Sequence, residues 1–271
     1  MAPLNLLVGF GLSLVIAALA YQRGSLAFSG AVGAVIVGTT IFAGGGWTWG
    51  LLLVAFFVTS SALSHYRARA KEPLSEKFQK GHRRDMAQVL ANGGWGALLA
   101  FSFAYAPQPI LFIAFAGAIA TVNADTWATE LGVLSKSLPR LVTNGRMVPV
   151  GTSGGVTLLG TLVAFGGASL IGVLAFFANL FSPISNFLVV PIAAVAGLLG
   201  SLFDSLLGAT AQAIYYCDYD QQETEAARHR CGRDTRLVRG WRWLDNDGVN
   251  FLASVFGSGL AAIMYRLAQG L

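Results

Sequence analysis

The stretch Gly155–Phe177 reads GVTLLGTLVAFGGASLIGVLAFF and contains no charged residue. A helix needs about 20 consecutive, mostly apolar residues to cross the hydrocarbon core of a bilayer. Seven more runs of this kind predict an all-α integral membrane protein with about eight transmembrane helices. The predicted helices are Leu4–Tyr21, Leu26–Phe42, Trp47–Ser64, Ala87–Tyr105, Pro109–Val122, Gly155–Phe177, Leu188–Ala213 and Val249–Leu267. The fifth is short, so we expect it to begin earlier or to continue past Asp125.

The composition supports the same fold class. Hydrophobic residues make up 55% of the 271-residue chain and charged residues only 11%, whereas soluble domains carry about 25% charged residues. The 33 glycines favour close approach of membrane helices. We expect one polytopic domain over residues 1–271, with a polar loop at residues 214–247 inside it.

The basic residues lie in alternate loops between the predicted helices. Positively charged loops stay on the cytosolic side of a membrane, which predicts that both termini lie outside and that the polar site faces the cytosol. We expect a prokaryotic cell membrane or an equivalent organelle membrane, an uncleaved first helix, and no nucleic-acid partner despite the net charge of +5. The loop residues are Arg23, Arg67, Arg69, Lys71, Lys77, Lys80, Arg83, Arg84, Lys136, Arg140, Arg146, Arg228, Arg230, Arg233, Arg236, Arg239 and Arg242.

The segment Ile119–Gly132, IATVNADTWATELG, ends an apolar run in two acids. A charge at the edge of a lipid-embedded helix is unfavourable unless it faces protein, water or a metal. Asp125 and Glu130, together with Asn123, therefore form the first candidate site. Five residues apart, the two carboxylates diverge by roughly 140° around a helix, so they reach one ion only if the helix unwinds. Capping, or pairing with loop arginines, is the alternative role.

A second acid interrupts the run Gly200–Gln212, GSLFDSLLGATAQ. Positions 200, 204 and 208 share one helix face, and Ser205 belongs to the adjacent stripe. This small, polar face predicts packing against protein rather than lipid. Asp204 either pairs with an arginine such as Arg84 or joins Asp125 in offering hard oxygen ligands from two helices. Such ligands suit Mg²⁺, which binds one or two carboxylates plus substrate phosphates.

The segment Val148–Thr157, VPVGTSGGVT, opens the sixth predicted helix and follows several basic residues. Thr152 or Ser153 is a suitable cap. The glycines leave backbone N–H groups free to approach an anion, which a helix N-terminus favours. The pattern indicates a phosphate-binding loop, and a plain cap with tight packing is the alternative. The residues assigned to phosphate binding are Lys136, Arg140, Thr152, Ser153, Gly154 and Gly155.

Polar residues also flank the fourth predicted helix. The basic segment Lys80–Asp85 precedes Gln88 and Asn92, which lie one turn apart on one face, and Asp85 is placed to join Gln88. Amides in a membrane helix need partners, so hydrogen bonds between helices and contacts with substrate are both open.

The last predicted helix opens with Leu244–Phe251, LDNDGVNF. Asp245 or Asn246 is a suitable N-cap, and we expect Asn250 to point inward from the first turns. Capping accounts for one of the polar residues in this segment and not for all of them.

The two cysteines, Cys217 and Cys231, share the polar loop, and their spacing matches no zinc or redox motif. We expect free thiols. The three histidines, His65, His82 and His229, form no ligand spacing, so the sequence supports neither zinc nor haem. We assign no chemistry to Cys217–Arg239, which looks like a solvated loop, in part helical or mobile.

Several of these motifs together resemble the transmembrane protein 19-like family. That family includes the plant phytyl-phosphate kinase of tocopherol and phylloquinone synthesis, and it is distantly similar to phytol and dolichol kinases and to membrane cytidylyltransferases. The resemblance runs from about the third predicted helix to the last. The matching segments are Gln88–Gly94, Ala124–Gly132, Pro139–Arg140, Val148–Thr157, Asp204–Thr210 and Val249–Asn250.

The resemblance implies transfer of a phosphoryl group from a nucleoside triphosphate, CTP or ATP, to an isoprenyl monophosphate such as phytyl or geranylgeranyl phosphate. On this hypothesis Asp125 and Asp204 hold Mg²⁺, with Glu130 bound directly or through water. The phosphate-binding loop, with Ser205, holds phosphates. The residues that orient one substrate are Arg84, Asn92, Asn123 and Asn250.

Two other classes of function remain open from the sequence. One is a related enzyme, a prenol kinase or a lipid cytidylyltransferase, which differs in its product. The other is a transporter of a phosphorylated lipid, which would move its ligand without nucleotide turnover. The alternate loops that lack charge argue against a transporter, because an exit path usually has a polar lining.

Overall fold

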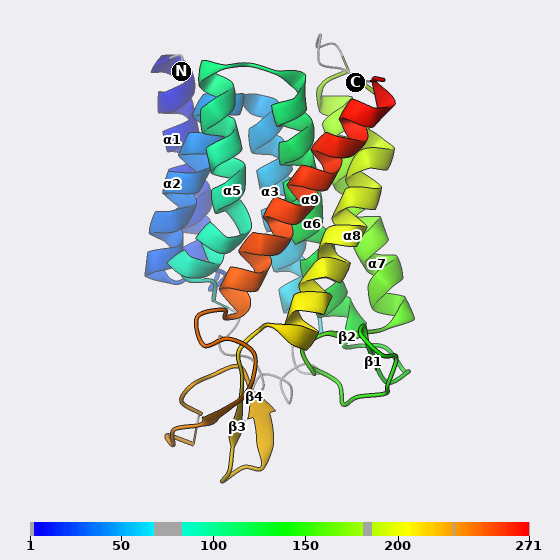
Figure 1. Cartoon of the computed structure of the whole chain (residues 1–271). Coiled ribbons are helices and arrows are strands. Elements are labelled where there is room, and N and C mark those ends of the chain that lie inside the picture. Colours follow the sequence, from blue (N-terminus) through cyan, green and yellow to red (C-terminus); the bar gives the residue numbers. More distant parts are fainter. Residues whose placement is uncertain (1–2, 68–82, 181–185, 230, 271) are drawn as a thin grey trace.

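The computed structural model describes residues 3–67, 83–180, 186–229 and 231–270. Over these residues the chain forms eight long helices and five short strands (Figure 1). The predicted loop residues Arg69, Lys71, Lys77, Lys80, His82 and Arg230 lie outside the described residues. The helices are α1 (Pro3–Gln22), α2 (Phe28–Gly45), α3 (Trp47–His65), α5 (Met86–Tyr105), α6 (Pro109–Gly132), α7 (Leu158–Ala178), α8 (Val189–Thr210) and α9 (Asn246–Ala268).

Each predicted helix corresponds to one of these, and the protein is an integral membrane protein. The predicted all-α membrane fold is confirmed: of its eight described helices, all except α5 are candidate membrane spans by length and hydropathy. Helix α5 contains the side-chain amides Gln88 and Asn92 and three glycines. Many large apolar side chains on the outer helices are exposed, among them Leu7 and Phe28, as expected for surfaces that face lipid.

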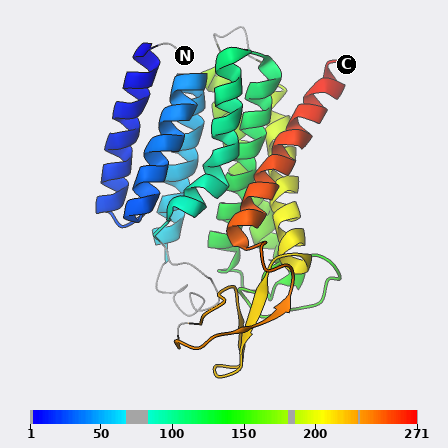
Figure 2. The ribbon, with the colours of Figure 1, turned by 60° about the vertical axis from the view of Figure 1, so that its left-hand side comes forward.

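The helices alternate in direction, so both termini lie at one end of the bundle (Figure 1). The opposite end of the bundle is called the polar end. It holds the C-terminal ends of the helices α1, α3, α6 and α8 and all five strands (Figures 1 and 2). The charged residues of the described loops between the helices gather at this end. The expectation that both termini lie outside the cell stays a prediction.

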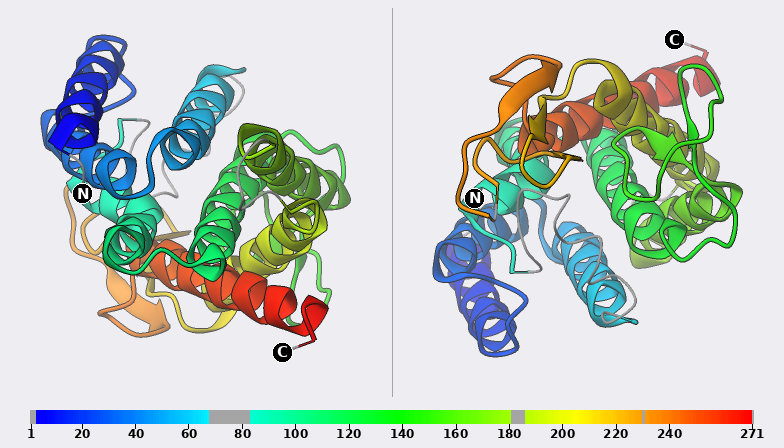
Figure 3. Two further views of the ribbon diagram at one scale, coloured as in Figure 1. Left: turned by 90° about the horizontal axis from the view of Figure 1, so that it is seen from above. Right: turned by 90° about the horizontal axis from the view of Figure 1, so that it is seen from below.

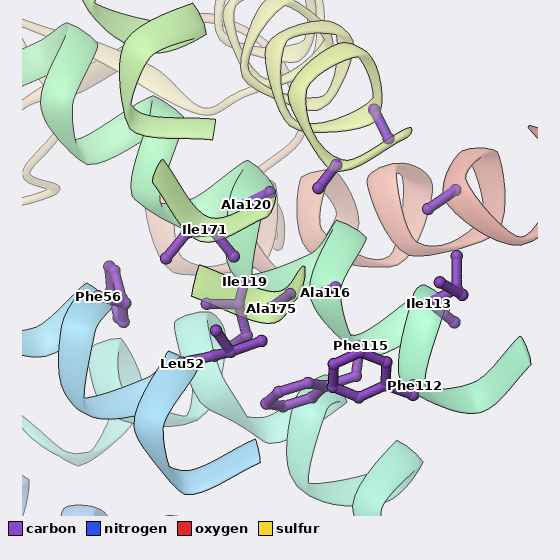
Figure 4. Packing of buried hydrophobic residues seen from close by; sticks show 14 of the residues in the cluster. Leu52, Phe56, Phe112, Ile113, Phe115, Ala116, Ile119, Ala120, Ile171 and Ala175 are labelled. Carbon is purple, nitrogen blue, oxygen red and sulfur yellow. The ribbon is translucent and has the colours of Figure 1, made fainter. Parts of the chain in front are cut away.

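Helix α6 forms the centre of the bundle. It contacts α3, α5, α7, α8 and α9, and the view along the helices shows α1 at the periphery (Figure 3). Its residues from Phe112 to Ala124 are all buried. The core around it includes Leu52, Phe115 and Ile171, none of which has an exposed surface (Figure 4). As predicted from its shortness, the helix continues past Asp125, without a break, to Gly132.

Glycines allow α8 and α9 to approach α6 closely. A Cβ atom built on Gly197 would lie 2.9 Å from the backbone of Ala120, and one on Gly200 would lie 2.5 Å from Cγ2 of Thr121. Gly257 of α9 faces the same threonine. The predicted packing of the 200–208 face against protein is therefore confirmed, and it brings the polar end of α8 against that of α6.

Two helix starts follow the predicted capping chemistry. Asp85 caps α5 and accepts a hydrogen bond from the Gln88 amide N–H at 2.9 Å, while the Gln88 side chain accepts from the Asp85 backbone at 3.1 Å. This reciprocal pair is a capping box. Asp245 caps α9 and accepts from the Gly248 N–H at 3.0 Å. Each of these two acids therefore fixes the residue at which its helix begins at the polar end.

The start of α7 corrects the sequence analysis. The helix begins at Leu158, and its cap is Thr157, whose hydroxyl accepts from the Gly160 N–H at 3.0 Å. Neither Thr152 nor Ser153 caps a helix. Residues 149–155 form tight turns instead, with Gly151 and Gly154 at φ of 80° and 82°, and they lead into a two-stranded sheet of β1 (Arg140–Leu141) and β2 (Gly155–Val156).

The polar segment before α9 contains strands and no described helix. The strands β3 (Ile214–Cys217), β4 (Gln222–Thr224) and β5 (Arg236–Arg239) form an antiparallel sheet in the order β4-β3-β5. This corrects the expectation of a loop that is in part helical. The sheet projects from the polar end beyond the helices (Figure 2).

Candidate functional site

A cavity of about 340 Å³ opens at the polar end, where α5, α6, α8 and α9 converge with the turns before α7. Five acidic side chains line it, and Arg84 is the one cationic residue among the described lining residues. Such an excess of negative charge calls for a cation if an anionic ligand is to enter. The acids are Asp125, Glu130, Asp204, Glu225 and Asp247.

Asp125 and Asp204 face the cavity from two crossing helices. Oδ1 of Asp125 lies 3.4 Å from the hydroxyl of Ser201, one turn from Asp204 on α8. The negative charges of Asp125 and Glu225 both act on Asp204. Among the described side chains, Oδ2 of Asp204 is buried and lacks a hydrogen-bond partner. A buried carboxylate oxygen without a partner is unfavourable, so this atom is set up for a ligand that the protein itself does not supply.

This donor set fits a magnesium ion. Mg²⁺ takes oxygen ligands, keeps several waters and typically uses one or two carboxylates. Asp125 and Asp204 supply two carboxylates from separate helices, and the partnerless Oδ2 of Asp204 is the observation that favours a cation there.

Glu130 points to another part of the cavity. Because α6 is helical throughout, Glu130 diverges from Asp125 by roughly 140° about the helix axis. The Ser64 hydroxyl of α3 donates to Glu130 Oε1 at 2.6 Å. The unwinding that would let Glu130 share an ion with Asp125 does not occur, so the assignment of Glu130 as a direct metal ligand with Asp125 is not supported by the geometry.

Arg84 lies at the same side of the cavity, where the negative charge of Glu130 acts on it. Burial lowers the pKa of Arg84 below its ordinary value, and the charge of Glu130 opposes that shift. Its guanidinium donates to Ser61 Oγ at 3.4 Å and lies 5.8 Å from the centre of the Phe56 ring. Its backbone bonds with Ser25 and Ala27. Arg84 is thus held against α3 and keeps its charge at one wall of the cavity.

The turn from Thr152 to Gly155 lines the cavity as predicted, but by a different structure. The Thr152 hydroxyl donates to Pro149 O at 2.8 Å, and the Ser153 hydroxyl donates to Gln212 Oε1 at 2.8 Å. Gly154 packs on the end of α8, where a Cβ would lie 2.5 Å from that of Ala209. The two hydroxyls therefore hold the turn in place, and the backbone N–H groups of Thr152 and Gly155 also donate within it, to Pro149 O and Thr152 O.

Ser153 belongs to a hydrogen-bonded chain that the sequence did not predict. The Gln212 side chain, 2% exposed, accepts from Ser153 and donates from Nε2 to Glu225 Oε1 at 2.9 Å. Glu225 comes directly after β4, so the three-stranded sheet reaches the edge of the cavity at this residue. Glu225 and Asp247 also line the cavity. The sequence analysis missed Glu225, which stands in no apolar run, and it noted the segment of Asp247 without assigning that residue to the site.

Three other predicted site residues also line the cavity: Asn92 from α5, Ser205 from α8 and Asn250 from α9. The Asn250 side chain donates to Asn246 O at 2.9 Å and leaves its oxygen for another partner. The inward orientation expected for Asn250 is therefore observed. These residues surround the acids with neutral polar groups.

Three predicted site residues lie away from the cavity lining. Asn123 is fully buried: its amide donates to Gly167 O at 2.8 Å and its oxygen accepts from Thr59 at 3.2 Å, so it joins α6 to α7 and α3. Lys136 is exposed, and Arg140 donates to Gly145 O at 2.9 Å within its own hairpin. The structure does not bring these three together with Asp125.

A second cavity, of about 440 Å³, adjoins the first. It lies between the hairpin of β1 and β2 and the strands β3 and β4, and both cavities share Thr152, Ser153 and Glu225 in their lining. Arg239 lines it and donates to Gly208 O at 3.3 Å. The polar end thus offers two neighbouring spaces, each with one described arginine.

Comparison with known proteins identifies relatives over most of the chain. The profile of the family described as integral membrane protein DUF92 matches residues 11–258. Protein PGR of Arabidopsis thaliana is 34% identical over 273 residues, covering 93% of both chains. An uncharacterized membrane protein of Methanocaldococcus jannaschii is 34% identical over 66% of this chain and 72% of its own.

Protein VTE6, chloroplastic, of Arabidopsis thaliana is 26% identical over 89% of this chain and 66% of its own. No solved structure matches the chain. The extent of the family match and the similarity to Protein PGR confirm the resemblance inferred from the motifs. The chain belongs to the DUF92 family of integral membrane proteins.

Proposed function

We propose that this protein is a membrane prenyl-phosphate kinase. It transfers the γ-phosphoryl group of a nucleoside triphosphate, CTP or ATP, to an isoprenyl monophosphate such as phytyl or geranylgeranyl phosphate. The observation that carries the proposal is the pair Asp125 and Asp204, with the buried and partnerless Oδ2 of Asp204, in a cavity at the polar end. The family resemblance to the plant phytyl-phosphate kinase supplies the reaction class.

The location of the cavity suits a lipid phosphate. The apolar helices that extend from the cavity toward the other end of the bundle offer surfaces for an isoprenoid chain. The cavity itself would bind the phosphate at the membrane boundary. The second cavity, with Arg239 in its lining, is a suitable entry for the nucleotide. In this arrangement the two phosphates meet between Asp204 and the turn at Thr152. We expect this end to face the cytosol.

Asp125 and Asp204 would hold Mg²⁺, which when bound neutralises charge on the phosphates. The side chains around the cavity would position the two substrates. Arg84 offers a cation from one wall, Asn92 and Asn250 offer hydrogen bonds, and Glu225 is fixed by Gln212. An oxygen of the lipid phosphate attacks the γ-phosphorus, the new P–O bond forms, and the bond to the nucleoside diphosphate breaks. The acceptor is already ionised, so the reaction needs no strong general base.

The test is a product assay on the purified chain in lipid nanodiscs. Phytyl or geranylgeranyl monophosphate is supplied with Mg²⁺ and CTP or ATP, and the lipids are identified by mass spectrometry. The expected product is the isoprenyl diphosphate. A monophosphate made from a free prenol, or a nucleotide-linked lipid, would replace the proposal by a prenol kinase or a cytidylyltransferase. Lipid movement without nucleotide turnover would replace it by a transporter.

A further inference from the structure

At the turn between β3 and β4, four side chains with metal-binding atoms converge outside the acidic cavity. Cys217 ends β3, Asp220 lies in the turn, and His229 and Cys231 come from the following segment. The ligand atoms all lie within 4.8 Å of one another. Figure 1 shows this sheet beyond the polar ends of the helices. The cluster therefore belongs to no part of the proposed kinase site.

The distances suit one tetrahedral ion. The two sulfur atoms are 3.7 Å apart, and Cys217 Sγ is 3.7 Å from Asp220 Oδ2. With Zn–S bonds of about 2.3 Å, two sulfurs on a regular tetrahedron are separated by about 3.8 Å. His229 Nδ1 lies 2.7 Å from Asp220 Oδ2, so these two atoms must move apart slightly, and the turn that carries the part-exposed Asp220 can allow this.

The surroundings of His229 also fit a metal ligand. The ring is buried, with 4% of its side chain exposed. While Nδ1 faces the other three ligands, Nε2 lies 3.4 Å from the side-chain amide of Gln222. A ligating histidine usually directs its second nitrogen to a hydrogen-bond partner that fixes the ring. Rotation of the Gln222 amide would present its oxygen to this nitrogen.

We propose that Cys217, Asp220, His229 and Cys231 form a structural zinc site. Two thiolates and an imidazole favour zinc over magnesium or calcium, and four protein ligands leave no open position, as is typical of a structural site. The spacing Cys-x₂-Asp followed by His-x-Cys was not recognised in the sequence, because the aspartate replaces a residue that zinc motifs usually fill with cysteine or histidine. The proposal therefore differs from the expectation drawn from the sequence, which supported no zinc.

The charge near the cluster is compatible with this ion. Two thiolates and a carboxylate with Zn²⁺ leave one net negative charge. Three arginines lie nearby in the chain: Arg233 stacks 4.2 Å from the Tyr219 ring centre, Arg236 pairs with Asp218 at 3.1 Å, and Arg228 donates to Gly232 O. The sulfur separation far exceeds the bonded distance of about 2.05 Å, so the cysteines are free thiols in this structure.

The site would fix the sheet to the segment that follows it. The ligands join the β3–β4 turn to residues 229–231, and β4 lies between Asp220 and Glu225. Glu225 lines both cavities and bonds to Gln212. Zinc binding therefore stabilises the strand that delivers Glu225 to the acidic cavity, a role in structure and not in phosphoryl transfer.

The test measures metal directly. The full chain, purified under reducing conditions with a tag that binds no metal, is analysed by mass spectrometry for elements. We expect about one zinc per chain, and we expect the Co²⁺-substituted protein to absorb visible light as a tetrahedral thiolate complex. Absence of bound zinc, together with no rise in Tm when Zn²⁺ is added, would overturn the proposal. A disulfide formed in the presence of reductant would overturn it as well.

Variants separate this site from the kinase site. Cys231→Ser changes an exposed residue and should lower zinc content at least 10-fold, and His229→Gln should do the same. His65→Gln is the matched control, because His65 lies in the last turn of α3 with its Nδ1 bonded to Ser61 O, and it should retain zinc. Asp125→Asn should also retain zinc whatever happens to activity, so that failure of one proposal leaves the other standing. Full zinc retention in both ligand variants would overturn the proposal.

Discussion

The described residues include two clusters of potential metal ligands that differ in ligand chemistry, in position and in access. The first lies where α6 crosses α8, uses the carboxylates of Asp125 and Asp204, and opens into a cavity. The second lies on a small sheet and uses two sulfurs, an imidazole and a carboxylate, and none of its four ligands lines either cavity. An open oxygen site suits exchange of a substrate-bearing ion, and a closed sulfur site suits a permanent one. The difference separates a proposed catalytic centre from a proposed structural one.

The largest expected effect comes from the oxygen site. Asp204→Asn and Asp125→Asn should each lower kinase activity by more than about 100-fold, since even residues that support a metal ligand commonly contribute 10- to 100-fold. Kinetics on nanodisc-embedded protein measure the effect. Asp218→Asn is the control, because that exposed acid pairs with Arg236 on the sheet surface. Activity within a few-fold of wild type in Asp204→Asn would remove the distinction between the two clusters.

A smaller effect is expected where the two regions meet. Glu225→Gln keeps the shape of the side chain and can still bond to Gln212, but it removes one of the negative charges that act on Asp204. We expect activity to fall by about 10-fold, in the range of residues that support a ligand, with zinc content unchanged. Titration of the Mg²⁺ dependence in the variant and in the wild type checks this. An unchanged Mg²⁺ dependence would mean that the sheet contributes nothing to the acidic cavity.

Helix packing beneath the oxygen site gives the next prediction. Gly200→Ala forces a Cβ against Thr121, and overpacking of this kind costs about 1–3 kcal/mol. We expect a lower Tm and lower activity, because the separation of α6 and α8 sets the distance between the two aspartates. Gly166→Ala on α7 is the matched control, since nothing lies within 4 Å of its added Cβ, and replacing a mid-helix glycine there should not destabilise. Equal Tm values for the two variants would contradict the packing account.

The smallest effect is expected at the start of α9. Asp245→Ala removes the carboxylate that accepts from the Gly248 N–H, and loss of such a cap costs about 1 kcal/mol. Thermal unfolding in detergent should show a modest decrease in Tm with zinc content intact. A large loss of activity without a change in Tm would instead assign Asp245 to substrate binding.

Much of the helical fold follows from the sequence. Apolar length fixed the ends of every predicted helix within a few residues, except the C-terminal end of the fifth, since α6 continues from Val122 to Gly132. The regular spacing of small residues around Asp204 predicted the seam that Gly200 and Thr121 form. The first residue of a helix was also predictable where a local capping bond determines it, as Asp85 and Gln88 do at the start of α5. These features depend on residues close together in the chain, which is why periodicity and capping rules find them.

The polar end was harder to predict, because its contacts join residues far apart in the chain. Strands β3 to β5 have mixed charge and no clean alternation, so they resembled a solvated loop. The actual cap of α7 is Thr157, since the earlier Thr152 lies in turns with positive φ. Glu225 lines the cavity and bonds to Gln212, thirteen residues before it in the chain, and Arg140 bonds within its own hairpin. No local pattern reports such contacts.

The central claim is that the aspartates of α6 and α8 support phosphoryl transfer to a lipid monophosphate. The most direct measurement follows radiolabelled γ-phosphate from CTP or ATP onto geranylgeranyl or phytyl monophosphate, in nanodiscs, with and without Mg²⁺. The account predicts a labelled isoprenyl diphosphate that requires Mg²⁺ and disappears in Asp204→Asn. Absence of labelled diphosphate with either nucleotide and either lipid, from wild-type protein of normal Tm, would contradict it.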